Sequence, residues 1–188
     1  MPANDAFVEL FVGRRFTSLA EFEETLSEYM KANFVNFVVA TSVRTANSRL
    51  RYDSISYRCV HCPRRGSQSK GIRKVNTQTT GCSARFHVRR RRGALVVSSY
   101  DMEHNHPISR SLYERHPLNR HLTPEEINET RPLFLCNTSI SYLKQYVADT
   151  YGKCLTTQDI VNIRSRLKPY PLTMEFEETV NRDNVNIV

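Results

Sequence analysis

The spacing of cysteine and histidine residues between positions 55 and 107 constrains the fold of this chain more than any other feature. Cys59 and Cys82 have 22 residues between them, Cys82 and His104 have 21, and only Asn105 separates His104 from His106. Thiolate sulfur and imidazole nitrogen suit Zn²⁺, which accepts four such ligands in a tetrahedron. The pattern therefore predicts a zinc site made by Cys59, Cys82, His104 and His106.

Each of these residues has an ordinary interpretation when it is taken singly. Free cysteines are among the most buried residues, so Cys59 and Cys82 would simply pack in a core. His104 and His106 would be surface residues beside a turn. A His-x-His pair that follows two spaced cysteines, with strand-like segments between, favours the metal site. Cys62 forms a C-x-x-C pair with Cys59 and stays open as the alternative first ligand.

The segments around these ligands predict a small antiparallel sheet. Strands are expected at 34–45, 54–60, 82–90 and 94–100, with a tight turn at 91–93. The second strand places Ile55, Tyr57 and Cys59 on one face, because side chains alternate along a strand. A helix from Ser18 to about Asn33 precedes the sheet, with Ser18 and Glu21 as a capping box. The prediction is an α+β fold: an N-terminal helix on a zinc-stapled antiparallel sheet.

The last third of the chain predicts three short helices in a helix-turn-helix-like segment. The first begins after Thr123 and is interrupted near its end by Pro132, the second spans 139–151 and is capped by Gly152, and the third covers about 156–167. The expected organisation is therefore a zinc domain at 1–108, a basic linker at 109–121, the helical segment at 122–170, and a tail at 171–188 that we expect to be poorly ordered.

Positive charge is concentrated on the cysteine and histidine segment. The 188-residue chain has a net charge of +8, but residues 51–120 alone carry fifteen basic and four acidic side chains. The flanks are close to neutral, so the block favours a phosphate-binding surface over a merely solvated face. The candidate DNA-binding residues are Arg64, Arg65, Lys70, Arg73, Lys74, Arg85, Arg89, Arg90, Arg91 and Arg92.

Other function classes are disfavoured. No apolar run is long enough to span a membrane, and the first ten residues lack a signal-peptide pattern. Five cysteines without a secretory segment argue against a disulfide framework, so we expect reduced thiols in the cytosol or nucleus. Four protein ligands leave zinc no open position for water, and no carboxylate cluster accompanies them, so we expect no enzymatic activity.

The chain resembles the FAR-type zinc domain of the WRKY–GCM superfamily. That domain heads Mutator-like (MULE) transposases and related proteins, including the N-termini of SWIM-type zinc finger proteins. The resemblance covers about residues 14–107 and is carried by the stretches 15–19, 21–22, 57–59, 81–86 and 103–107. It implies one zinc held by two cysteines and the His-x-His pair, with Cys59 in preference to Cys62. The WRKY heptad is absent, so its DNA-reading strand is not carried over.

The resemblance and the charge together predict a nuclear, zinc-dependent DNA-binding module, either transcription-regulator-like or a detached transposase N-terminus. Lysines and arginines would neutralise phosphates of double-stranded DNA. The alternative is a protein-interaction module in which zinc is purely structural. The slightly acidic helical segment favours a protein partner or self-association through residues 122–167. We expect neither a membrane nor a small-molecule substrate.

Overall fold

The structure is a computed structural model that describes residues 3–63, 79–136 and 138–167. The chain divides into two compact units, one that ends at His116 and one that begins at Pro117. No helix in these described ranges is both long enough and apolar enough to cross a membrane.

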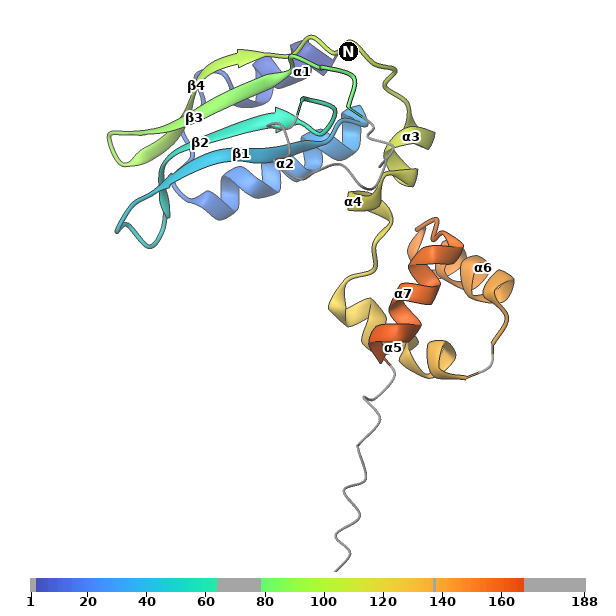
Figure 1. Cartoon of the computed structure of the whole chain (residues 1–188). Coiled ribbons are helices and arrows are strands. Elements are labelled where there is room, and N and C mark those ends of the chain that lie inside the picture. The colour runs from blue at the N-terminus through green and yellow to red at the C-terminus, as the bar shows by residue number, and fades with distance from the viewer. Residues whose placement is uncertain (1–2, 64–78, 137, 168–188) are drawn as a thin grey trace, which may run out of the picture. The chain divides into compact units, whose positions relative to one another are not determined.

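The first unit is a four-stranded antiparallel sheet with two helices on one face (Figure 1). The strands are β1 (Phe37–Arg44), β2 (Tyr52–Cys59), β3 (Arg85–Arg91) and β4 (Ala94–Asp101), and their order in the sheet is their order in the chain. The helices are α1 (Ala3–Phe11) and α2 (Leu19–Asn33). The predicted α+β class and the helix on an antiparallel sheet are confirmed.

Helix α2 begins at the predicted residue, but its cap differs from a closed capping box. The Ser18 side chain accepts a hydrogen bond from the Glu21 backbone N–H at 3.1 Å, as predicted. The Glu21 carboxylate instead accepts from the backbone N–H of Thr17 at 3.1 Å. The Glu21 side chain therefore binds Thr17, the residue before the cap, and this hydrogen bond holds the preceding backbone against the first turn of α2.

Alternation along the strands builds the core. Ile55, Tyr57 and Cys59 of β2 and Phe86 of β3 are buried on the helical side. The rings of Tyr57 and Phe86 stack with centroids 4.7 Å apart. Side chains between the buried positions, such as Arg85 and Arg89, are exposed. The sheet thus has one apolar face and one polar, basic face.

Helix α1 was not predicted. It is only nine residues long, and short helices are marginal without tertiary packing. Phe7 and Phe11 lie one turn apart, are fully buried and stack at 4.8 Å. Phe7 also packs against Tyr29 of α2 and Phe86 of β3. The sequence signal was this pair of phenylalanines at i, i+4 spacing.

The segment 109–121, expected as a linker, contains two short helices, α3 (Arg110–Arg115) and α4 (Pro117–Arg120). The second unit continues with α5 (Pro124–Leu135), α6 (Ile140–Tyr151) and α7 (Thr157–Leu167). Thr123 and Glu126 form a complete capping box for α5. Pro132 lies inside α5 and does not end it. The tail at 171–188 lies outside the described residues.

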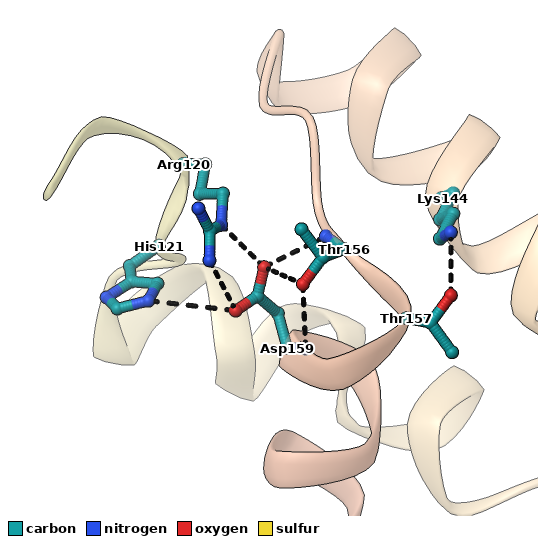
Figure 2. A network of polar contacts seen from close by, with 6 residues as sticks. All are labelled: Arg120, His121, Lys144, Thr156, Thr157 and Asp159. Carbon is teal, nitrogen blue, oxygen red and sulfur yellow. Dashed lines mark hydrogen bonds and ion pairs between the residues drawn. The ribbon is translucent and has the colours of Figure 1, made fainter. Parts of the chain in front are cut away.

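A polar network centred on the buried Asp159 joins two ends of the second unit (Figure 2). Arg120 donates to both carboxylate oxygens of Asp159, from Nε at 2.7 Å and from a terminal nitrogen at 3.2 Å. Asp159 also accepts from the backbone N–H of Thr156 at 2.9 Å and from its hydroxyl at 2.7 Å. Because Arg120 lies on α4 and Asp159 on α7, the network ties the start of the unit to its last helix.

Candidate metal centre

Four donor side chains meet at one end of the sheet. Cys59 is the last residue of β2, Cys82 lies three residues before β3, and His104 and His106 follow β4. In an antiparallel sheet the end of β2, the start of β3 and the end of β4 lie at the same end. Their ligand atoms all lie within 4.8 Å of one another. The predicted residues Cys59, Cys82, His104 and His106 are thus brought together.

The distances between the donors suit a tetrahedral ion. Zn–S bonds of about 2.3 Å and Zn–N bonds of about 2.0–2.1 Å place neighbouring donors about 3.3 to 3.8 Å apart. Cys59 Sγ lies 3.2 Å from His106 Nε2, and Cys82 Sγ lies 3.5 Å from His104 Nδ1. The two imidazoles approach at 3.1 Å, through His104 Nδ1 and His106 Nε2. Two sulfur and two nitrogen donors at such distances fit a metal ion.

Burial sets the protonation of these side chains in the absence of an ion. It raises the pKa of the Cys59 thiol to about 12 and lowers the pKa of His104 to about 4. The His106 pKa is lowered as well, again mainly by burial. The imidazoles are therefore neutral and ready to act as ligands at neutral pH, whereas Cys59 must release its proton to bind a metal.

One polar atom of the group has no hydrogen-bond partner among the described residues. The Nε2 atom of His104 is buried, and the ring of Phe37 lies beside its imidazole with centroids 5.8 Å apart. The other nitrogen, Nδ1, faces the donors. An ion held by Nδ1 would require the proton to sit on Nε2, which is buried without a hydrogen-bond partner among the described residues.

Cys62 lies outside the group of four. It is buried, but its Sγ donates to the Cys82 carbonyl at 2.7 Å and lies 3.6 Å from the Ala84 carbonyl. Burial raises the pKa of the Cys62 thiol, so it stays a neutral donor. Cys59 and not Cys62 thus lies within the donor group, and the Cys62 hydrogen bond joins the loop after β2 to the segment that carries Cys82.

The comparison with protein-family models agrees with this geometry. Residues 10–106 match the model described as zinc finger SWIM domain-containing protein 3, N-terminal. The match covers more than half of the 188 residues and includes all four donors. The chain belongs to this family. Searches of curated proteins and of solved structures found no match.

Hydrogen bonds hold the ligand segments of this SWIM-family domain in place. Asn105, between the two histidines, donates to the Thr80 carbonyl at 3.0 Å and accepts from its hydroxyl at 2.8 Å. The Cys82 backbone N–H donates to the His61 carbonyl at 3.3 Å, and the rings of His61 and His106 lie 4.2 Å apart. We did not predict these supports. The only signal for them was the Asn placed inside the His-x-His pair.

The predicted basic residues of this domain fall into two sets. Arg64, Arg65, Lys70, Arg73 and Lys74 lie outside the described residues. The exposed set is on β3 and in the β3–β4 turn and consists of Arg85, Arg89, Arg90, Arg91 and Arg92. Arg85 lies toward the metal centre, and the other four lie at the opposite end of the sheet, so the structure gathers them away from the ligands.

Proposed function

We propose that this chain is a zinc-dependent module, related to Mutator-like transposases, that binds double-stranded DNA in the nucleus. Membership of a SWIM zinc finger family and a two-cysteine, two-histidine donor group support zinc as the metal. Zinc would act as a structural ion that joins the ends of β2, β3 and β4. Because four protein donors fill a tetrahedron, we propose no enzymatic activity.

The observation that best supports DNA binding is that most arginines at the β3–β4 turn are exposed and, among the described residues, unpaired. The side chains of Arg89, Arg91 and Arg92 are exposed and make no ion pair or hydrogen bond within the described ranges. Arg90 alone is paired, with Asp53 at 2.6 Å. Free guanidinium groups on a rigid turn suit phosphate oxygens, which they bind with a fork of N–H donors.

The turn itself is well fixed. Arg92 and Gly93 have φ angles of 47° and 75°, the left-handed pair that a two-residue hairpin turn requires. Arg15 donates to the backbone carbonyls of Arg91 and Arg92 at 3.3 and 3.0 Å. Beside it, Phe16 and Leu95 exchange backbone hydrogen bonds of 2.9 and 2.8 Å. The arginine side chains are thus presented on a preorganised backbone, which lowers the entropic cost of binding.

The test uses the whole chain, purified with zinc, and a fluorescently labelled random duplex. We expect salt-sensitive binding, with a dissociation constant of roughly 10⁻⁴–10⁻⁶ M at physiological salt, as is typical of phosphate-driven contacts. Cys82→Ser should lose both zinc and DNA binding. The matched control is Cys136→Ser, which changes an exposed cysteine outside the donor group and should keep both.

Three outcomes would overturn the proposal. Wild-type protein that carries zinc but does not bind DNA at low salt would favour the protein-interaction alternative, in which the metal only holds the fold. Equal DNA binding by wild type and by folded, metal-free Cys82→Ser would remove the zinc dependence. Retention of an acidic protein ligand in place of DNA would likewise assign the basic face to another partner.

A further inference from the structure

The pairing of the strands brings a second arginine-bearing loop to the end of the sheet opposite the metal centre. The β1–β2 hairpin and the β3–β4 hairpin point the same way (Figure 1). Tyr52, at the start of β2, pairs with Arg44, and Ser54 pairs with Arg89 near the end of β3. The loop between β1 and β2 contains Arg49 and Arg51. Two arginine-rich turns therefore lie side by side.

The positive charges of the arginines in the β1–β2 hairpin have no acidic partner among the described residues. Arg44, Arg49 and Arg51 are exposed, and across the described part of the chain none of their side chains has a hydrogen bond or an ion pair. The nearest acidic side chain along the chain, Asp53, is already occupied by Arg90. Three free positive charges within eight residues repel one another unless an anion lies between them.

The loop that carries them is anchored rather than loose. Leu50 is buried in the core at 1% exposure. The Asn47 side chain accepts from the backbone N–H groups of Arg49 and Leu50, both at 3.0 Å, and Leu19 of α2 donates to the Arg49 carbonyl at 3.1 Å. These contacts hold the backbone of the loop in place, and the arginine side chains extend from it into solvent.

Arg51 adopts a conformation that a non-glycine residue rarely takes. Its φ is 60°, in the left-handed region, where the Cβ of a non-glycine residue crowds the backbone. Glycine adopts this conformation without strain. Strained backbone positions cluster at binding and catalytic sites, so Arg51 marks this turn as a candidate contact.

An open pocket of about 340 Å³ also lies at the loop between β1 and β2. It is lined by two arginines and by residues with hydroxyl or amide side chains: Arg44, Thr45, Asn47, Ser48, Arg51 and Tyr52. No carboxylate is among them. Guanidinium forks together with hydroxyl donors are the groups that bind a phosphate.

We propose that Arg44, Arg49 and Arg51 form a second phosphate-contacting element that grips the same DNA duplex as the β3–β4 turn. This inference rests on the proposed DNA-binding function and assigns its surface to the hairpin end of the sheet. Hairpin centres two strands apart are about 10 Å from each other. That span is close to the major-groove width of about 12 Å, so the two turns match phosphates on opposite sides of the groove.

The test compares two triple variants of the full chain with equal charge change. The first changes Arg44, Arg49 and Arg51 to Gln. The control changes three exposed arginines of α3, α5 and α7, Arg110, Arg131 and Arg166, to Gln. DNA affinity is measured from about 50 to 200 mM salt. Each lost phosphate contact should reduce the slope of log K against log salt by about 0.9, so the hairpin variant should lose roughly 2 to 3 units and the control should lose none.

Folding is monitored separately by zinc content and thermal melting, and Arg51→Gly provides a second variant. Glycine removes the strain, so this change should leave the melting temperature unchanged or raise it while it lowers DNA affinity. Equal losses in both triple variants, or a hairpin variant that binds as wild type does, would overturn this inference and leave DNA binding by the chain intact. Wild type that binds no DNA, or prefers an RNA duplex, would refute the DNA assignment itself.

Discussion

Replacing Cys59 with Ser should remove the metal ion, whereas replacing Cys62 should not. Cys59 Sγ lies 3.2 Å from His106 Nε2 within the donor group, whereas Cys62 Sγ bonds to the Cys82 carbonyl. Both thiols are buried and lie three residues apart, so the two variants are closely matched. Native mass spectrometry should find one zinc ion per chain in wild type and in Cys62→Ser, and none in Cys59→Ser.

The size of the stability effect follows from ligand loss. Mutation of an outer hydrogen-bonding partner of a metal ligand already weakens metal affinity 10–100-fold, so loss of a direct ligand should cost at least about 100-fold. At saturating zinc this is at least about 2.7 kcal/mol of lost linkage energy. For a unit that ends at His116, 1 kcal/mol corresponds to roughly 4 °C, so the melting temperature should fall by at least about 10 °C.

A chelator separates this effect from ordinary packing damage. EDTA should lower the melting temperature of wild type and of Cys62→Ser by a similar amount, and it should leave Cys59→Ser unchanged. The serine hydroxyl in Cys62→Ser can still donate to the Cys82 carbonyl, so this variant should melt within a few degrees of wild type. Zinc retained by Cys59→Ser and lost by Cys62→Ser would refute the ligand assignment.

Two further predictions concern the cores of the two units. Burial would raise the pKa of Asp159, but hydrogen bonds from Arg120 and Thr156 outweigh it and lower the pKa to about 2, so the stability this carboxylate provides is complete above about pH 4 and lost as pH falls toward 2. In Asp159→Asn, hydrogen exchange of α7 should report a local stability lower by about 2 kcal/mol, and this stability should no longer change between pH 4 and pH 2. An unaltered pH dependence would contradict the prediction. Asp149→Asn, which changes an exposed carboxylate, is the control. Phe86→Ala should cost about 3–5 kcal/mol in denaturant unfolding, since the ring is fully buried, and a cost under 1 kcal/mol would contradict the packing argument.

The sheet and the donor group were predictable because they rest on local patterns. Alternation of apolar residues identifies a strand whatever its neighbours, and the His-x-His pair is a short-range feature. The turn at 91–93 could be predicted from its glycine alone. Helix α1 escaped because nine residues hold too little periodic signal, and its stability comes from aromatic contacts with residues far along the chain. The end of α5 at Leu135 was also expected, but no break occurs at Pro132, and Phe134 beyond it packs in the core of the second unit.

The arginines of the β1–β2 hairpin were missed for a related reason. Residues 1–50 carry five basic and six acidic side chains, so the net charge of this segment is close to zero and gives no sign of Arg44 and Arg49. Charge is felt through space, and strand pairing places these residues beside the run from Arg89 to Arg92. A surface formed by two hairpins that are distant in sequence requires the sheet register, which composition alone does not contain.

The register also connects the two ends of the sheet. The metal ligands lie at the end of β2, before β3 and after β4, and the arginine turns lie at the other end of the same strands. A slip of one residue in any pair would turn every side chain of that strand to the opposite face. An ion bound by Cys59, Cys82, His104 and His106 would forbid such a slip. In the proposed function, zinc would therefore support DNA binding by keeping the sheet in register, and loss of the metal, as in Cys82→Ser, should remove the binding together with the register.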